Sequence, residues 1–220
     1  MKKCLILANG KPPAKSIYNY LVKAGYNYLI CADGGANSAF KLKILPNAII
    51  GDLDSIRPEV LRYFTGKCLV KKISRQNDTD VEKCLKFAVS NRFEEAVLLG
   101  GTGDRLDHSF CNLGIVLKFF NKIKLGIYHE KTFLFAAAGK LEMKTQTGEL
   151  ISIYGINRLT KITSSGLKYP LKNVSLPFGE RESTSNTAVG KKVILSIRNG
   201  KIFIIREFNN LKKNGFFFSS

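Results

Sequence analysis

Two aspartates stand one residue apart directly after a short apolar run. Residues 48–56 read AIIGDLDSI, so Asp52 and Asp54 follow a stretch with the character of a buried strand. In an extended backbone their side chains point to one side about 6.5 Å apart, where they repel by about 2–3 kcal/mol at an effective dielectric constant of about 20. A cation between the two carboxylates would remove that repulsion. The pair therefore points to a metal site, with a strand-ending turn as the structural alternative.

Three more polar turns follow other apolar runs. They read DGGAN at 33–37, QNDTD at 76–80 and GGTGDRLDH at 100–108. In open α/β sheets ligands bind at the carboxyl ends of the strands, so these turns and the turn at Asp52 are expected to converge on one rim. Carboxylates bind hard cations, and glycine-rich turns let backbone N–H groups approach phosphate. Together the four turns predict a site for a cation and a phosphate group.

The segments that must position these turns alternate between strand and helix patterns. Thr79 and Glu82 form a capping box at the start of the best-specified helix. The alternation predicts an N-terminal parallel α/β (Rossmann-like) sheet. Apolar runs predict strands at 3–8, 28–32, 48–50, 68–71, 95–99 and 124–128, and helical patterns fall at 16–24, 37–41, 79–90 and 107–120.

Beyond about residue 133 the pattern changes to consecutive strands. The predicted strands lie at 140–144, 150–156, 160–164, 193–198 and 201–206. The last two flank Asn199 and Gly200, and an Asn-Gly pair is the strongest short signal for a hairpin. We therefore expect an α/β domain followed by a smaller C-terminal β-sandwich domain, with residues 1–138 in the first and 139–220 in the second.

The composition excludes several classes of protein. With 220 residues, of which 45% are hydrophobic, the chain resembles an ordinary globular protein, and no apolar run is long enough to span a bilayer. Five cysteines without a C-x-x-C pair indicate neither a disulfide framework nor a zinc site, and a cytoplasmic location is expected. The formal net charge is +18, but the basic residues are scattered along the chain. We expect no nucleic-acid and no membrane partner.

The polar turns resemble, in type and order, the motifs of the thiamin pyrophosphokinase (thiamin diphosphokinase) family. That family has D-G-G-A-N, G-D-x-D-S, Q/K-D-x-T-D and G-x-x-G-x-R-x-D-H stretches, followed by G-L-K-[WY]-x-L and S-x-S-N stretches. The last two read GLKYPL at 166–171 and STSN at 183–186 in this chain. The chain departs from the pattern at Asn77, where the family usually has Asp, and at Asp104, where small residues or Lys are frequent.

The resemblance implies a kinase of thiamin diphosphate biosynthesis, a Mg²⁺-dependent homodimer that transfers a diphosphate group from ATP to the hydroxyethyl group of thiamin and releases AMP. It also implies that Asp52, Asp54 and Asp80 are both metal ligands and catalytic residues, one of which could accept the hydroxyl proton. The residues expected to bind ATP are Asp33, Gly34, Gly35, Asn37, Gln76, Asp78, Thr79, Thr102, Arg105, Asp107 and His108. The residues expected to bind thiamin are Tyr169, Ser183, Ser185 and Asn186, in a pocket shared between two subunits.

Alternatives remain open at this point. Asp80 could be an acid that interacts with a helix dipole, Arg105 a surface arginine, and His108 a structural histidine. The acceptor could be another small hydroxymethyl compound, such as a pterin alcohol. A different class, a basic nucleic-acid-binding protein, is raised by the net charge. Four acidic turns on one rim argue against it, because they would repel phosphodiesters in the absence of a metal.

Overall fold

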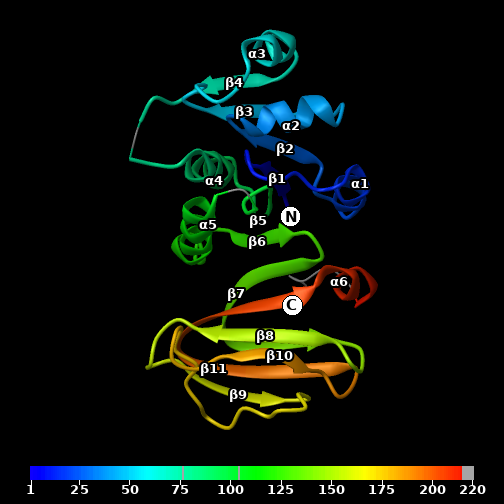
Figure 1. Ribbon diagram of the computed structural model, residues 1–220, viewed down its shortest axis with the longest axis vertical. Coiled ribbons are helices and arrows are strands. Elements are labelled where there is room, and N and C mark those ends of the chain that lie inside the picture. The colour runs from blue at the N-terminus through cyan, green and yellow to red at the C-terminus, as the bar shows by residue number, and fades with distance from the viewer. Residues whose placement is uncertain (76, 104, 215–220) are drawn as a thin grey trace. The chain divides into compact units, whose positions relative to one another are not determined.

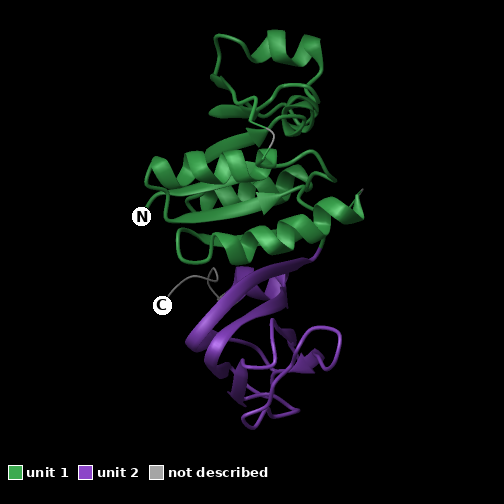
Figure 2. Ribbon diagram, turned by 90° about the vertical axis from the view of Figure 1, so that its left-hand side faces the viewer, with its two compact units in different colours: residues 1–130 green, residues 131–220 purple. Residues whose placement is uncertain are grey.

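The computed structural model describes residues 1–75, 77–103 and 105–214 of the chain. The chain forms two compact units, residues 1–130 and 131–220, coloured green and purple in Figure 2. The predicted boundary at residue 138 lies inside strand β7 (Thr132–Lys144). Because β7 is continuous, the division falls before it, at the turn that follows β6 (Lys124–His129).

Unit 1 contains a six-stranded sheet in the order β6-β5-β1-β2-β3-β4 (Figure 1). Every neighbouring pair in this sheet is parallel, which confirms the predicted α/β class. The six strands start and end within one residue of the predicted positions. Their bounds are β1 Lys3–Leu7, β2 Tyr28–Ala32, β3 Ala48–Gly51, β4 Leu69–Lys72, β5 Glu95–Leu99 and β6 Lys124–His129.

Burial along the strands follows their place in this sheet. All five residues of β5 are buried, and four of the five in β2 are buried, because central parallel strands are covered on both faces. Strand β4 lies at the edge, and Lys71 and Lys72 are exposed there. Charged side chains on an edge strand discourage pairing with another chain, so this edge stays open to solvent.

The helices of unit 1 are α1 Lys15–Lys23, α2 Gly35–Lys41, α3 Pro58–Phe64, α4 Asp80–Ser90 and α5 Leu106–Lys118. Helix α4 has the predicted capping box, in which Thr79 accepts from the backbone N–H of Glu82 and the Glu82 carboxylate accepts from that of Thr79. Helix α3 was not predicted, because its seven residues bury only Val60 and Phe64. None of the helices in the described ranges has both the length and the apolar composition needed to cross a bilayer.

Unit 2 is built around the long strand β11 (Lys192–Glu207). Strand β7 pairs antiparallel along one edge of β11, while β9 pairs with its first half and β8 with its second half along the other edge. Strand β10 adds to β8. The remaining elements are β8 Leu150–Gly155, β9 Lys161–Ser165, β10 Ser183–Thr187 and the terminal helix α6 Phe208–Asn214. The prediction that an all-β part follows the α/β part is confirmed.

The predicted hairpin at Asn199 and Gly200 is wrong. The segments on both sides of this pair belong to one strand and pair with β7, and the register shifts between Ile197 and Ile202. Asn199 has φ 59°, and a Cβ on Gly200 would lie 1.9 Å from the Thr160 hydroxyl. The Asn-Gly pair therefore forms a bulge that uses a left-handed conformation and a close backbone approach, not a reversal of the chain.

Candidate active site

The strand order of unit 1 creates a switch point at the carboxyl end of β1. Strand β2 pairs with one edge of β1 and β5 with the other, so the loop after β1, which leads to β2, and the loop after β5, which leads to β6, diverge in opposite directions. Ligands of open α/β sheets bind in such a crevice. A cavity of about 390 Å³ lies there, which falls within the usual range for small-molecule sites. The turns that follow β1, β2, β3 and β5 all contribute to its lining.

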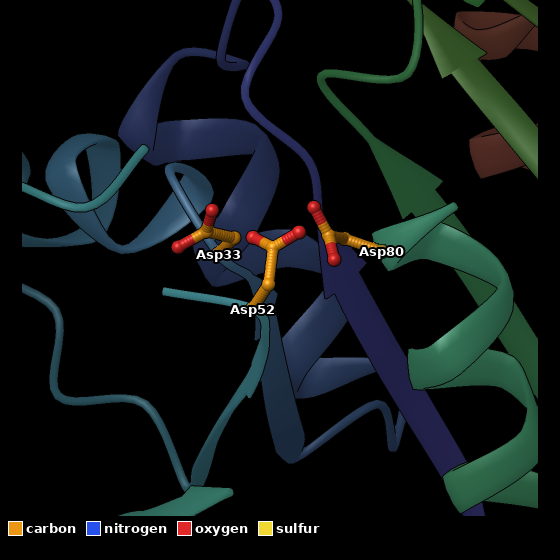
Figure 3. Close-up of side chains that lie close together, drawn as sticks. All are labelled: Asp33, Asp52 and Asp80. Carbon is orange, nitrogen blue, oxygen red and sulfur yellow. The ribbon is translucent and has the colours of Figure 1, made fainter. Parts of the chain in front are cut away.

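Three carboxylates come together in this cavity. Asp33 follows β2, Asp52 follows β3, and Asp80 is the first residue of α4. One oxygen atom from each lies within 4.8 Å of the others, and Figure 3 shows the side chains pointing toward one another. Asp33 Oδ1 and Asp52 Oδ1 are buried and accept no hydrogen bond. Buried carboxylate oxygens without hydrogen-bond donors are unfavourable unless positive charge lies nearby, and a divalent cation would supply that charge.

Asp33 is the most buried member of the group, at 1% exposure. Its backbone has φ 42°, and its N–H donates to the Ile50 carbonyl at 3.0 Å, which turns the chain at the end of β2. Its Oδ2 accepts from the Ser55 backbone N–H at 2.9 Å. Burial raises the pKa of the Asp33 carboxyl to about 6; the Ser55 hydrogen bond opposes this shift, and Asp54 and Asp80 add to it. The cluster by itself therefore holds its negative charge at a cost in free energy.

Lys83 supplies the positive charge that faces this cluster. It lies one turn after Asp80 on α4, its side chain is 3% exposed, and its Nζ is 2.8 Å from Asp80 Oδ1 and 3.7 Å from Asp52 Oδ2. Burial favours the neutral amine, but the hydrogen bond to Asp80 and the charges of Asp80 and Asp52 raise the pKa of Lys83. Sequence reasoning missed this residue. The signal available was the spacing of three between Asp80 and Lys83, which places both on one helix face.

Gly51 is the residue that lets the carboxylates converge. A Cβ at this position would lie 2.6 Å from the Asp33 Cβ and 3.1 Å from Asp80 Oδ1. Gly35 has a comparable role below the rim, since a Cβ there would lie 2.0 Å from the Leu7 carbonyl oxygen. Gly35 was predicted to let backbone groups approach phosphate. In the structure its lack of a side chain serves the close packing of α2 on β1.

Asp54 is not one of the three grouped carboxylates. It is exposed, and its Oδ1 accepts from the Ser55 hydroxyl at 2.9 Å. Leu53 has φ 66°, so the backbone between Asp52 and Asp54 is not extended as the spacing argument assumed. The hydrogen bond from the Ser55 hydroxyl lowers the pKa of the Asp54 carboxyl. Asp54 thus lies beside the cluster, and its assignment as a metal ligand and catalytic residue stays a prediction.

Several predicted ATP-binding residues line the same cavity. Gly34, Asp78, Thr79 and His108 do so together with Asp33. The Asp78 carboxylate is 2.6 Å from Lys86 Nζ and 3.6 Å from Arg75 Nε, and the hydrogen bond from Lys86 lowers its pKa. The predicted residue Gln76 and the departure at Asp104 lie outside the described residues.

Two other predicted residues are engaged with protein groups. The Asn37 side chain donates to the Ser55 carbonyl and accepts from the Arg57 backbone N–H, both at 3.0 Å, so it holds the turn that carries Asp52. The Thr102 hydroxyl lies 2.7 Å from His129 Nδ1. These contacts position the rim, and direct contact of Asn37 or Thr102 with nucleotide stays a prediction.

Arg105 and Asp107 bind each other. Arg105 Nε lies 3.1 Å from Asp107 Oδ1, and Nη2 lies 2.5 Å from Oδ2. Both side chains are more than 60% exposed, and the hydrogen bond from Arg105 lowers the pKa of Asp107 to about 2. A guanidinium that donates two parallel hydrogen bonds to a carboxylate has a geometry that also suits two oxygen atoms of a phosphate group. Binding of ATP by this pair stays a prediction.

The predicted thiamin-binding residues lie in unit 2. Asn186 is buried, and its side chain accepts from the Tyr169 backbone N–H at 3.1 Å and donates to the Tyr169 carbonyl at 2.7 Å and to the Ser183 hydroxyl at 3.1 Å. Ser185 has φ 53°, and its N–H donates to the Ser152 hydroxyl. Tyr169 itself is 63% exposed. Asn186 thus holds the turn that presents the Tyr169 ring.

Other residues of the cavity were also missed. Asn9 and Gly10 follow β1, and Asn112 of α5 is buried and donates to the Gly101 carbonyl at 2.6 Å. Asn9 packs against Gly34, where a Cβ would lie 2.5 Å from the Asn9 side chain. The sequence offered no acidic or glycine-rich signal at Asn112, because the residue lies within a helix. Its place at the rim follows from the packing of α5.

The comparisons with known proteins agree on one family. Residues 20–128 match the catalytic domain of thiamin pyrophosphokinase, and residues 140–202 match its vitamin B1 binding domain. The chain is 31% identical over 219 residues to thiamin pyrophosphokinase 1 of Caenorhabditis elegans, covering 91% of this chain and 87% of the relative. It is also 31% identical over 191 residues to thiamine pyrophosphokinase 1 of Oryza sativa subsp. japonica, covering 71% of this chain and 70% of the relative.

Solved structures share the fold. The thiamine pyrophosphokinase of Bacillus subtilis superposes with a TM-score of 0.80 at 22% identity, covering 94% of this chain and 99% of that one. Yeast thiamin pyrophosphokinase superposes with the same TM-score of 0.80 at 20% identity, covering 96% of this chain and 88% of that one. With both family domains matched in order and relatives aligned along most of its length, the chain belongs to the thiamin pyrophosphokinase family.

Proposed function

We propose that this protein transfers a diphosphate group from ATP to the hydroxyethyl oxygen of thiamin, giving thiamin diphosphate and AMP. The observation that carries the proposal is the group of three carboxylates, Asp33, Asp52 and Asp80, inside a cavity at the switch point of a parallel sheet. Such phosphoryl chemistry depends mainly on positioning and charge neutralisation. Membership of the family supports the identity of both substrates.

The residues present fit a magnesium ion. Three oxygen donors lie within 4.8 Å of one another, and two of their oxygen atoms are buried without a hydrogen-bond donor. Mg²⁺ prefers carboxylate oxygens and keeps several waters, which suits a cavity open to a polyphosphate. When bound, Mg²⁺ neutralises and orients the phosphates. Asp33, Asp52 and Asp80 would hold it, and Asp54 lies next to them as the predicted further ligand.

The chain's own groups then have distinct tasks. One of the predicted catalytic carboxylates, Asp52, Asp54 or Asp80, accepts the proton of the thiamin hydroxyl as that oxygen attacks the β-phosphorus. Lys83 and Arg105 supply positive charge near the developing negative charge of the transferred group. The buried position of the cluster keeps these interactions stronger than they would be in bulk water.

Thiamin binding is proposed for unit 2. The exposed Tyr169 ring offers an aromatic face to a cationic ligand with two aromatic rings, and Asn186 holds the Tyr169 backbone in place. Tyr154 and Phe178 form a second aromatic pair, with ring centroids 6.4 Å apart. Ser183 and Ser185, at the start of β10, offer hydroxyl groups to orient the ligand.

We further propose a homodimer whose active sites are shared between subunits. Unit 2 has an apolar sheet face on which Phe203 and Ile205 of β11 lie opposite Ala136 and Leu134 of β7, and all four are only half-buried. A second copy of the chain would cover this face. We place the protein in the cytoplasm, with no nucleic-acid or membrane partner.

Mixing two inactive variants tests the shared site. If Asp52 and Tyr169 act together across subunits, a mixture of Asp52→Ala and Tyr169→Ala chains regains about one quarter of wild-type activity, because half the dimers are mixed and one of their two sites is intact. Each variant alone is inactive. A mixture as inactive as its components, with mixed dimers detected by mass spectrometry, contradicts sharing.

The reaction itself is tested by AMP release. Purified protein is incubated with ATP, Mg²⁺ and either thiamin or a pterin alcohol, with Asp52→Ala as the inactive control. We expect AMP and thiamin diphosphate in equal amounts with thiamin and neither with the pterin alcohol. AMP formed only with the pterin alcohol would identify the other acceptor. Salt-sensitive RNA or DNA binding without any AMP release would favour the nucleic-acid-binding alternative.

A further inference from the structure

The carboxylate cluster contains its own cation. Among the described residues, Lys83 is the basic group within 4 Å of Asp52 and of Asp80, and its side chain is 3% exposed. The neighbouring bases on this rim are occupied elsewhere: Lys86 lies 2.6 Å from Asp78, and Arg75 lies 3.6 Å from it. A buried lysine beside carboxylates stays charged because it neutralises them.

The charges of the cluster have a simple balance. Three ionised carboxylates carry −3 and the Lys83 ammonium carries +1, which leaves −2. A divalent cation would complete the neutralisation, so the site can hold both positive groups without excess charge. The two carboxylates that Lys83 contacts, those of Asp80 and Asp52, however, are also two of the three that a metal ion would use. Lysine and metal therefore compete for the same two carboxylate groups.

We propose that Lys83 is the internal counter-ion of the metal site and competes with the divalent cation for Asp80 and Asp52. This inference rests on the proposed function, because it takes the cluster to be a metal site. In the metal-free protein the amine forms ion pairs with two of the three carboxylates and so stabilises the folded state despite their mutual repulsion. The same amine lowers the affinity for free metal, so the cation enters mainly together with the nucleotide phosphates, whose negative charge offsets the repulsion.

The size of the effect follows from the distances. The amine is 3.7 Å or less from an oxygen of Asp52 and of Asp80, so an ion about 2.1 Å from those oxygens lies within about 6 Å of the amine. A divalent and a monovalent charge at about 6 Å repel enough in water to change an affinity about tenfold, and more at the lower dielectric of a cavity. Removing the charge of Lys83 is therefore expected to tighten metal binding by about tenfold or more.

The test measures binding of MnCl₂ alone, without nucleotide, by titration calorimetry on the full chain. Wild type is compared with Lys83→Met, with Lys83→Arg, which keeps the charge, and with Lys86→Met, a neutralised lysine on the same helix that pairs with Asp78. We expect Lys83→Met to bind Mn²⁺ about tenfold more tightly than wild type and to unfold at a lower temperature in EDTA. Lys83→Arg and Lys86→Met are expected to bind Mn²⁺ as wild type does.

The outcomes separate this inference from the function on which it rests. Mn²⁺ binding that Asp52→Asn abolishes and that Lys83→Met leaves unchanged or weakens would overturn competition by Lys83 while keeping the metal site. Mn²⁺ binding that is absent in every variant, or insensitive to Asp52→Asn, would overturn the metal site and this inference together. If Lys83→Met does not fold, Lys83→Gln, which is one atom shorter but keeps an uncharged polar end, provides the same comparison.

Discussion

Asp33→Asn should make the metal-free protein more stable while it damages the active site. Burial raises the pKa of Asp33 from 3.8 to about 6 in the folded protein. An acid whose folded pKa is raised binds more protons in the folded state, so stability falls as pH rises from about 4 to about 6 and stays reduced above that range. The shift corresponds to about 3 kcal/mol, an upper bound because solvent in the cavity screens part of the charge.

The substitution keeps the shape of the side chain. The amide oxygen of asparagine can still accept from the Ser55 N–H, the bond that Asp33 Oδ2 makes at 2.9 Å. At pH 8 in EDTA, Asp33→Asn is therefore expected to be more stable than wild type by up to about 3 kcal/mol, whereas at pH 4 the two should differ little. Loss of one metal-binding oxygen should lower turnover at least about a hundredfold, as expected when a group that stabilises transition-state charge is removed.

Thermal unfolding of both proteins at pH 4 and pH 8 in EDTA, followed by circular dichroism, measures this difference. Asp54→Asn is the matched control, because Asp54 is exposed and has a lowered pKa, so its midpoint should move less than that of Asp33→Asn. Saturating Mg²⁺ should stabilise wild type more than Asp33→Asn. The reasoning is refuted if Asp33→Asn is no more stable than wild type at pH 8, or if its gain is equally large at pH 4.

Three further substitutions test other parts of the argument. Asp54→Asn is expected to keep the fold and abolish turnover in the AMP-release assay; wild-type turnover would remove Asp54 from the catalytic residues. Gly51→Ala places a methyl group 2.6 Å from the Asp33 Cβ, so it should lower the free energy of unfolding in denaturant by about 1–3 kcal/mol and weaken Mn²⁺ binding. An unchanged stability and an unchanged Mn²⁺ affinity would contradict this steric effect. Asn186→Ala removes the hydrogen bonds that hold the Tyr169 turn, so it should destabilise the protein by about 2–4 kcal/mol. It should also raise KM for thiamin while KM for ATP stays constant. A rise in KM for ATP alone would argue against thiamin binding at this turn.

Local patterns in the sequence determined the strands of unit 1 and most of its helices. Its central strands are short apolar runs that end at acidic or glycine-rich turns. Because these strands are buried on both faces, nearly all of their residues are apolar, and the sequence alone marks their bounds. The capping box at Thr79 placed the start of α4 correctly, because both of its hydrogen bonds join residues three apart. The four polar turns were expected on one rim, since the carboxyl ends of parallel strands meet there.

Tertiary structure decided which residues meet. The Asn199-Gly200 pair specifies a backbone conformation, but whether it reverses the chain or bulges a strand depends on the partner, and β7 pairs with both halves of β11. The polar segment 183–187 became a strand because β8 offered an edge.

The sequence alone determined that this protein has an acidic, glycine-rich rim on an α/β sheet, followed by a β-structure with the segments of a known family. It did not determine the composition of the cluster. Asp33 lies with Asp52 and Asp80 in the cluster and Asp54 lies beside it, because Leu53 leaves the extended conformation and Gly51 allows the approach from β2. Lys83 entered the site because helix packing turned it inward. Spacing along the chain specifies local geometry, whereas contacts between segments far apart in the sequence depend on how strands and helices pack.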